Sequence, residues 1–283
     1  MEFGKENRPK FQIKNRRIYM KVGYLGPKGT FSFEVAKNYY KSAELVEFNT
    51  ILEVIISLKN EEIDKAVVPI ENSIQGGVTE TIDAIIENDR IFVNKEIKMK
   101  INQNLLANKK YKLSEIKEIY SHPQAIAQCR KYIDQNLKNA KIIKVSSTAL
   151  AAKEITQKEY CACIANISCL EEYGLQLLGK NIHDNDFNTT KFWVLSKREI
   201  KNGNKMSLIF STKHKPGALY QVLGVFNKNQ INLTKIESRP AKTKLGEYIF
   251  LVDLDINENI NKVMQELNNE CNYLKVLGRY EEI

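Results

Sequence analysis

From residue 20 to about residue 195, short apolar runs alternate with segments of helical periodicity, and few folds are compatible with that alternation. It is typical of an α/β domain, in which helices cover a largely buried sheet. The short apolar runs predict the buried strands of that sheet. The predicted strands are Val22–Leu25, Ala66–Ile70, Ile119–Tyr120, Ile142–Val145 and Cys161–Ile164.

Two segments between these strands gather their apolar side chains on one helical face, which we expect to pack on the sheet. The first face comprises Phe31, Val35, Ala36, Tyr39 and Tyr40, and the second comprises Leu52, Ile55, Ile56 and the aliphatic part of Lys59. A further strand is expected at Phe192–Leu195, which places Trp193 in the core.

A second domain follows the polar stretch from Lys197 to Lys205, which we interpret as a linker. The pattern beyond it predicts the element order β-α-β-β-α-β, which is a ferredoxin-like module. Its predicted elements are Ser207–Ser211, Tyr220–Phe226, Asn232–Glu237, Tyr248–Asp253, Asn259–Leu267 and Tyr273–Tyr280. We therefore expect two domains, residues 20–197 and residues 205–283.

The chain carries a net charge of +9, and more than half of it lies at the N-terminus. Residues 1–21 hold seven basic and two acidic side chains, which leaves +4 for the remaining 262 residues. This segment lacks helical periodicity, so we expect residues 1–19 to be a disordered basic leader. Basic arms can bind nucleic acid, but no aromatic side chains alternate with these arginines, and no nucleic-acid partner is expected.

No apolar run approaches the roughly 20 residues that a membrane-spanning helix needs, and no apolar segment typical of a signal peptide follows the basic start. Five cysteines, an odd number, predict free thiols in a reducing compartment. We therefore expect a cytoplasmic protein. Cys161, Cys163 and Cys169 lack the further ligands of a zinc site, and their apolar neighbours predict a buried strand instead.

Four strand ends lead into segments that begin with hydroxyl, amide or glycine residues. These junctions are Leu25–Phe31, Ile70–Gly77, Tyr120–Pro123 and Val145–Thr148. The free N–H groups at helix starts bind carboxylates and phosphates, and ligands of α/β sheets collect at the carboxyl ends of strands. A single such residue is commonly only a helix cap. Because four occur, and because nucleotide-binding, zincin and nucleophile-elbow motifs are absent, the sequence predicts a small-anion pocket without metal or nucleotide.

Several ordered motifs resemble the signatures of prephenate dehydratases over about residues 20–195. They are Gly26-Pro27-Lys28-Gly29-Thr30-Phe31, Pro69-Ile70-Glu71-Asn72-Ser73, Ser121-His122-Pro123-Gln124-Ala125 and Asn188-Thr189-Thr190-Lys191-Phe192. The resemblance implies a two-lobed fold like that of type II periplasmic binding proteins, with the active site in the cleft. The lobes would be about residues 20–96 plus 185–196, and about residues 97–184.

The resemblance also implies a lyase of phenylalanine biosynthesis that converts prephenate to phenylpyruvate, carbon dioxide and water without a cofactor. Thr190 matches the threonine that the family treats as essential, so we expect it to donate a hydrogen bond to the departing hydroxyl. The residues expected to bind substrate are Thr30, Glu71, Asn72, Ser73, Ser121, His122, Gln124, Ser147, Thr148, Asn188, Lys191 and Phe192.

Three of these residues leave their roles open. Lys191 replaces the arginine usual in the family, and we favour direct contact with a substrate carboxylate over a structural role. For Glu71 we favour an orienting group over a protonated acid with a raised pKa. For His122 we favour a helix cap over a general acid.

The second domain resembles an ACT domain, a module that binds amino acids between paired copies. His214-Lys215-Pro216-Gly217-Ala218-Leu219 and Glu237-Ser238-Arg239-Pro240 carry the resemblance. It implies that phenylalanine is an allosteric effector and that the protein is a homodimer or homotetramer. The residues expected to bind phenylalanine are Gly217, Ala218, Leu219, Asn232, Glu237, Ser238, Arg239 and Pro240.

Two other functions remain open from the sequence. The enzyme could act on arogenate, in which an amino group replaces the keto oxygen of prephenate. Alternatively, the same fold could serve as a small-anion sensor without catalytic activity. Assays of turnover on both compounds would separate the three possibilities.

Overall fold

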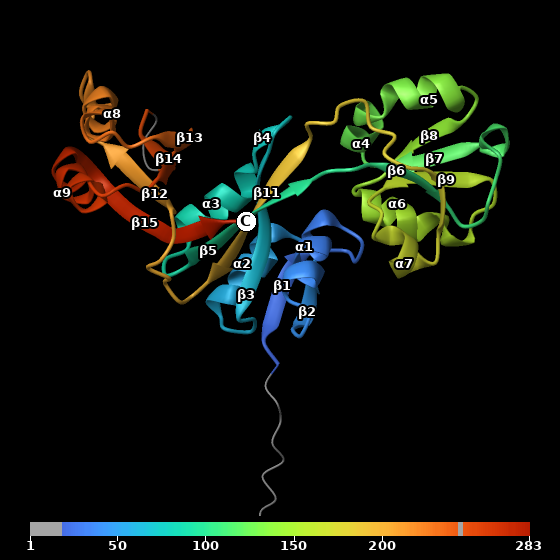
Figure 1. The fold of residues 1–283 in the computed structure, drawn as a ribbon, viewed down its shortest axis with the longest axis horizontal. Coiled ribbons are helices and arrows are strands. Elements are labelled where there is room, and N and C mark those ends of the chain that lie inside the picture. Colours follow the sequence, from blue (N-terminus) through green and yellow to red (C-terminus); the bar gives the residue numbers. More distant parts are fainter. Residues whose placement is uncertain (1–18, 243–245) are drawn as a thin grey trace, which may run out of the picture.

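The computed structural model describes residues 19–242 and 246–283. The predicted leader, residues 1–19, therefore lies outside the described residues except for Tyr19. Within the described ranges, no helix is both long and apolar enough to cross a bilayer. Figure 1 shows three bodies in a row, with a ten-stranded sheet that extends from the middle to the left and a five-stranded sheet at the right.

The larger sheet contains both N-terminal and C-terminal strands. Its main path runs in the order β13-β14-β12-β15-β5-β11-β3-β1-β2, and β4 pairs with β3 outside this path. The strands are β1 (Lys21–Leu25), β2 (Glu44–Phe48), β3 (Lys65–Asn72), β4 (Gly76–Gly77), β5 (Phe92–Lys100), β11 (Thr189–Ser196), β12 (Lys205–Thr212), β13 (Leu233–Pro240), β14 (Tyr248–Asp255) and β15 (Cys271–Glu282).

The smaller sheet forms the second lobe, in the order β10-β6-β9-β7-β8. Its strands are β6 (Asn104–Ala107), β7 (Glu118–Ser121), β8 (Lys141–Lys144), β9 (Cys161–Ala165) and β10 (Gln176–Gly179). All five residues of β9 are buried, and every cysteine of the chain is a free thiol. Burial raises the pKa of Cys163 well above its usual value, so this thiol is a core side chain rather than a nucleophile. All six strands predicted in the first domain, including the one at Phe192–Leu195, are thus confirmed.

Helices cover the sheets of both lobes and of the C-terminal module. They are α1 (Phe31–Tyr39), α2 (Ile51–Lys59), α3 (Thr79–Glu87), α4 (Pro123–Gln128), α5 (Arg130–Asn136), α6 (Thr148–Glu154), α7 (Cys169–Tyr173), α8 (Ala218–Lys228) and α9 (Ile260–Glu270). Two short 3-10 helices lie at Leu113–Glu115 and Ile155–Gln157.

The predicted buried face of α2 is only partly correct, because Ile55 is buried as predicted but its predicted neighbours are not. Leu52 and Ile56 are 44% and 42% exposed, whereas Ile51, Val54, Ile55 and Leu58 are buried. The Thr50 hydroxyl accepts a hydrogen bond from the Glu53 N–H and so starts the helix at Ile51. From that start, the spacing i, i+3, i+4 and i+7 forms the apolar stripe that faces the sheet. The face predicted for α1 is nearer to the structure, although Tyr39 is exposed.

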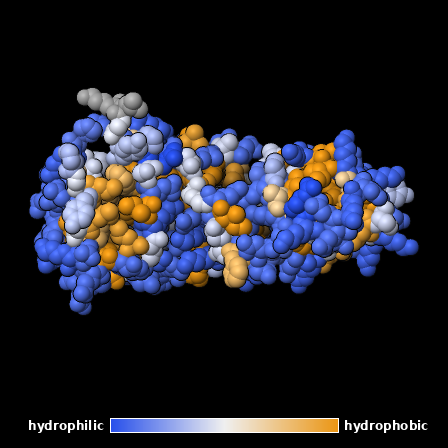
Figure 2. Space-filling model, turned by 90° about the horizontal axis from the view of Figure 1, so that it is seen from above, coloured by the Kyte–Doolittle hydropathy of each residue, from blue (hydrophilic) through white to orange (hydrophobic). Residues whose placement is uncertain are grey.

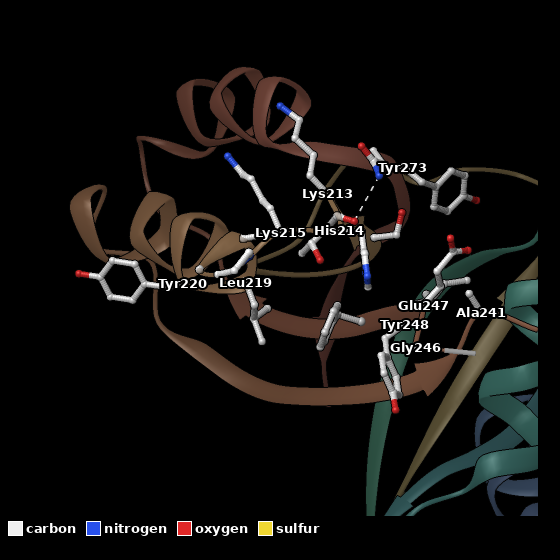
Figure 3. Close-up of a pocket in the computed structure, with 18 residues that line it drawn as sticks. Lys213, His214, Lys215, Leu219, Tyr220, Ala241, Gly246, Glu247, Tyr248 and Tyr273 are labelled. Carbon is white, nitrogen blue, oxygen red and sulfur yellow. Dashed lines mark hydrogen bonds between the residues drawn. The ribbon is translucent and has the colours of Figure 1, made fainter. Parts of the chain in front are cut away.

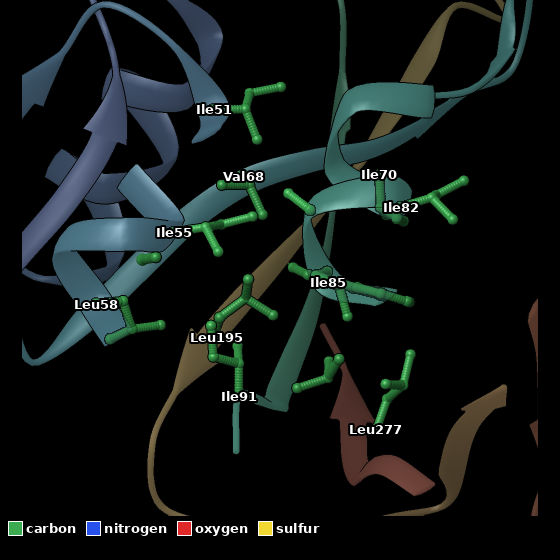
Figure 4. Close-up of a cluster of buried hydrophobic side chains, with 14 of the residues drawn as sticks. Ile51, Ile55, Leu58, Val68, Ile70, Ile82, Ile85, Ile91, Leu195 and Leu277 are labelled. Carbon is green, nitrogen blue, oxygen red and sulfur yellow. The ribbon is translucent and has the colours of Figure 1, made fainter. Parts of the chain in front are cut away.

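The C-terminal module has the predicted β-α-β-β-α-β order, and it shares both a sheet and a core with the first lobe. Strand β15 pairs in parallel with β5, through Glu281 opposite Lys95 and Glu282 opposite Glu96. Leu277 of β15 lies beside Ile85 of α3 in one continuous apolar cluster (Figure 4). The module is therefore packed on the first lobe across a buried surface.

The two lobes touch along one side of the cleft between them. The Tyr173 hydroxyl of α7 donates a hydrogen bond to the Lys28 carbonyl at 2.6 Å, and Lys37 of α1 lies 2.9 Å from both Glu171 and Glu172. Gly29 has a φ of +87°, and a Cβ there would meet the Cys169 sulfur. A glycine is therefore needed for the lobes to approach this closely.

Candidate active site

A cleft of about 290 Å³ lies between the two sheets, close to the lower end of the size range of small-molecule sites. Side chains from both lobes line it. They are Leu25, Phe31, Ser32, Pro69, Asn72, Gln75, Val78, Ile101, Gln103, His122, Gln124, Ala125, Gln128, Ser146, Ser147, Thr148, Thr190 and Phe192. Of the residues predicted to contact substrate, the structure brings Asn72, His122, Gln124, Ser147, Thr148, Thr190 and Phe192 together here.

Three of the four predicted strand-to-helix junctions form as expected around this cleft. Thr30 caps α1 by accepting from the Phe33 N–H, His122 caps α4, and Ser147 caps α6 by accepting from the Leu150 N–H. The fourth junction differs, because the segment after Ile70 turns back as the β3–β4 hairpin before α3 begins.

The Thr190 hydroxyl is held as a hydrogen-bond donor toward the cleft. The Asn72 side-chain nitrogen donates to the Thr190 oxygen at 2.9 Å and to the Asn188 side-chain oxygen at 2.7 Å. The Asn72 side-chain oxygen accepts from the N–H groups of Ile74 and Gln75, which fixes the orientation of the amide. Since the Thr190 oxygen accepts from Asn72, its own hydrogen is free for another partner.

The lining of the cleft is almost entirely uncharged. No Lys, Arg, Asp or Glu side chain is among the lining residues, all of which belong to the described ranges, and His122 is the one titratable side chain there. The ring nitrogen Nδ1 of His122 accepts from the Gln124 N–H at 3.3 Å, as a helix cap does. Hydroxyls, side-chain amides and backbone N–H groups are thus the polar groups that a ligand would meet.

Four predicted substrate residues stand behind the lining and support it. The Thr30 hydroxyl donates to the Leu25 carbonyl, and the fully buried Ser121 hydroxyl donates to the Ile164 carbonyl at 2.6 Å. Ser73 donates to the Phe187 carbonyl, and Asn188 accepts from Asn72. These four residues hold loops and strands in place rather than facing the cleft.

The structure places Lys191 and Glu71, two of the residues predicted to contact substrate, behind the sheet rather than in the cleft. Neither residue lines the cleft, and their charged atoms, Nζ of Lys191 and Oε2 of Glu71, lie 2.8 Å apart. The physical reason is strand geometry, since successive side chains of a strand point to opposite faces of a sheet. Thr190 faces the cleft, so Lys191 faces the C-terminal domain on the other side.

Both side chains of this pair are charged. Burial favours the neutral acid of Glu71, but Lys191 and Lys235 outweigh that effect and lower the pKa of the Glu71 carboxyl. Burial likewise opposes the charge of Lys191, but its contact with Glu71 and the carboxylate of Glu96 raise the pKa of its ammonium group. This direction favours the orienting role of Glu71 over that of a protonated acid.

Three glutamines of the lining, Gln75, Gln103 and Gln128, were not predicted as substrate residues, and two of them pair with each other. The Gln103 Nε2 donates to the Gln128 Oε1 at 3.4 Å, while the Gln103 oxygen and the Gln128 nitrogen have no partner within the described ranges. Gln128 lies four residues after Gln124, so helical spacing from that motif could have indicated it. Gln103 lies in the crossover between the lobes, where no local pattern identifies it.

A second pocket, of about 690 Å³, lies in the C-terminal domain. Gly217, Ala218 and Leu219 line it at the start of α8, and Gly217 has a φ of +77°. Figure 3 shows Leu219 of α8 on one side of this pocket, and Tyr248 of β14 and Tyr273 of β15 on the other.

The other residues predicted to bind phenylalanine do not line this pocket. Asn232 donates to the Asp255 carboxylate. The guanidinium of Arg239 instead makes two hydrogen bonds to Asp83 of α3, at 2.9 and 3.1 Å. Ser238 and Pro240 are exposed on the opposite face of β13. Glu237 points, like Arg239, toward the first lobe, where a Cβ on Gly77 would meet its carboxylate.

Comparisons with known proteins agree with this architecture. A family model described as prephenate dehydratase matches residues 22–200, and one described as ACT domain matches residues 206–272. The chain is 39% identical over 273 residues to a prephenate dehydratase from Lactococcus lactis subsp. lactis, covering 92% of this chain and 97% of that protein. It is also 39% identical to a bifunctional chorismate mutase/prephenate dehydratase from Aquifex aeolicus, over 92% of this chain and 73% of that protein.

One solved structure is similar over nearly the whole chain. It is the prephenate dehydratase from Arthrobacter aurescens in complex with L-Phe, with a TM-score of 0.85 and 32% identity. The match covers 93% of this chain and 90% of that one.

Proposed function

The chain belongs to the prephenate dehydratase family, and from that membership we propose that it is a lyase that converts prephenate to phenylpyruvate in phenylalanine biosynthesis. The observation that supports this function best is the Thr190 hydroxyl, which Asn72 orients as a donor at an uncharged cleft. The same residues would serve an arogenate dehydratase, so the substrate must be tested directly.

The reaction requires one carboxylate to leave as carbon dioxide while the ring hydroxyl departs. The electron pair of the breaking carbon–carbon bond enters the ring, which becomes aromatic, and the hydroxyl takes up a proton to leave as water. Thr190 donates a hydrogen bond to the departing oxygen as negative charge develops there. Donors placed in advance at such an oxygen typically contribute ~2.7–4 kcal/mol to lowering the barrier.

The uncharged lining suits the loss of carbon dioxide. A lysine or arginine beside the departing carboxylate would stabilise the substrate more than the transition state, in which that charge moves into the ring. Ser147, Thr148 and the first-turn N–H groups of the lining are the donors available for the remaining, pyruvyl carboxylate. His122 acts in this account as the cap of α4.

Phenylalanine is proposed to act through the C-terminal domain. The pocket beside Gly217 offers backbone N–H groups at a helix start together with apolar side chains, which suits an aromatic amino acid. Large side chains of this domain, including Tyr220, Ile236, Tyr248 and Tyr273, are exposed, and Figure 2 shows an apolar patch on the same domain at the left end of the molecule. A second copy of the chain, in a homodimer or homotetramer, would cover such side chains. We place the enzyme in the cytoplasm.

The direct test is to incubate the purified protein with prephenate and with arogenate, each with and without phenylalanine, and to follow product absorbance. We expect phenylpyruvate from prephenate and a rate that falls when phenylalanine is added. No turnover of either compound would contradict the enzyme assignment and favour a sensor. If only arogenate is turned over, the enzyme is an arogenate dehydratase rather than a prephenate dehydratase.

A further inference from the structure

Strands β3 and β11 carry two residue pairs on opposite faces of the sheet. Thr190 and Asn72, here called the cleft pair, face the cleft, and the ion pair of Lys191 and Glu71 lies next to them on the back face. In the antiparallel pairing of these strands, Thr190 lies opposite Asn72 and Lys191 lies opposite Glu71. Each charged residue is thus the immediate neighbour, in its own strand, of a residue that lines the cleft. Strands β3 and β11 form the wall of the cleft, here called the catalytic wall. This wall is a single sheet, so the two pairs share the same backbone.

The C-terminal domain supplies the next charges on this back face. The ammonium nitrogen of Lys235, on β13, lies 4.0 Å from Oε2 of Glu71 and 3.2 Å from Oε2 of Glu237. The Lys235 side chain is only 6% exposed. Strand β13 therefore contacts the catalytic wall through buried charges at the position of the cleft pair.

The Glu237 side chain of β13 also packs closely against the backbone of strand β4. Gly77 of β4 pairs with Glu71, and a Cβ on Gly77 would occupy the space of the Glu237 carboxylate. The β3–β4 hairpin is also the segment whose N–H groups, at Ile74 and Gln75, hold the Asn72 amide. A shift of β13 would therefore act on the same turn that orients Asn72.

Partial burial makes this contact sensitive to the loss of one charge. The side chains of Glu71 and Lys191 are 27% and 20% exposed, and Glu71 Oε2 has no hydrogen-bond partner within the described ranges beyond these ammonium groups. When one member of a buried pair is removed, the other is left without compensation, whereas replacing both can be nearly neutral.

Given the proposed dehydratase activity, we propose that Lys191 and Glu71 are positioning residues that couple strand β13 of the regulatory domain to Thr190 and Asn72. They touch neither substrate nor effector. They fix the positions of strands β3 and β11, and therefore of Thr190 and Asn72. A movement of β13 changes these positions through Lys235.

The test uses the full chain with four variants: Lys191→Met, Glu71→Gln, the double variant, and Lys191→Arg. For each, kcat and KM for prephenate and the phenylalanine concentration that halves the rate are measured. Lys191→Met should lower kcat by about 10- to 100-fold, as small displacements of reacting groups do, with KM nearly unchanged. Lys191→Arg, which keeps the charge, should retain both activity and response.

The double variant separates positioning from simple stability. It leaves no unpaired charge, so it should recover folding and much of kcat, yet the phenylalanine effect should fall about 2- to 30-fold. Lys109→Met is the matched control, because Lys109 forms an ion pair with Glu159 that is more than 60% exposed. It should change neither kinetics nor response.

Three results would overturn the proposal. A raised KM with unchanged kcat in Lys191→Met would place Lys191 on the substrate. The proposed coupling would also be contradicted if the double variant kept an unaltered phenylalanine response. The same holds if the wild-type enzyme is active but its rate does not change with phenylalanine. If the wild type turns over no substrate, the failure is that of the proposed function instead.

Discussion

Strands β3 and β11 divide the molecule into two regions that differ in their chemistry. On one face, Thr190 and Asn72 line the cleft. Its lining residues, all within the described ranges, include no Lys, Arg, Asp or Glu. On the other, Lys191, Glu71 and Lys235 form a partly buried charged junction with the C-terminal domain. A neutral cleft suits a substrate that must lose a carboxylate, and a charged junction suits a contact that must hold one geometry.

The largest effect should come from the cleft face. Thr190→Ala should lower kcat by about 10²–10³-fold, equivalent to ~2.7–4 kcal/mol, because a preorganised donor to the leaving oxygen is lost. Thr190→Ser keeps the hydroxyl and should lose much less. Steady-state kinetics with prephenate measure both variants. Near-normal turnover by the alanine variant would refute the role given to Thr190.

The carboxyl of Asp253 on β14, which interacts with Lys235 and Lys191 of the junction, should make stability depend on pH between pH 4 and 7. Asp253 is 1% exposed, and burial raises the pKa of its carboxyl to about 6 from 3.8. Since the folded state favours the protonated acid, this stabilisation is complete below about pH 4 and is lost as pH rises through 6, by up to about 3 kcal/mol.

Asp253→Asn tests this difference, because asparagine keeps an acceptor for the Ser207 hydroxyl, which donates to Asp253 at 2.5 Å. Urea unfolding at pH 4.5 and pH 7 should show a smaller loss of stability in the variant than in the wild type. Parallel pH profiles of the two proteins would show that Asp253 does not titrate in this range.

A smaller effect is expected when the donor behind Thr190 is removed. Asn72→Ala should raise the barrier by about 1–3 kcal/mol, or roughly 5- to 150-fold in kcat, because the Thr190 hydroxyl loses its fixed orientation. KM should change less than kcat. A variant with normal kcat but raised KM would mean that Asn72 binds the substrate directly and orients nothing.

The smallest stability effect should come from the close contact at the junction. Gly77→Ala places a Cβ against the end of the flexible Glu237 side chain, which can move, so we expect a cost of only about 1 kcal/mol. The phenylalanine response should nevertheless weaken. Gly224→Ala, in α8 with open space around it, is the control and should leave that response intact. Equal phenylalanine responses in the two variants would show that the junction does not transmit the effect of phenylalanine.

The sequence allowed the strands, the C-terminal module and the cleft motifs to be predicted, because apolar runs and helix caps are local signals. Alternation along β11 also separates Lys191 from Thr190, but the domain that covers the Lys191 side is determined by tertiary packing. The hairpin after Asn72 and the start of α2 at Ile51 depend on single turns and caps, which periodicity alone does not locate. Gln103 lies in a crossover without a pattern, and only the folded chain brings it to the cleft.

A crystal structure of Thr190→Val with prephenate bound tests the division between the two faces most directly. We expect the ring hydroxyl to lie against residue 190, within reach of Asn72, and the substrate to make no contact with Lys191 or Glu71. A substrate carboxylate bound to the Lys191 ammonium group, with residue 190 remote from the hydroxyl, would contradict the account.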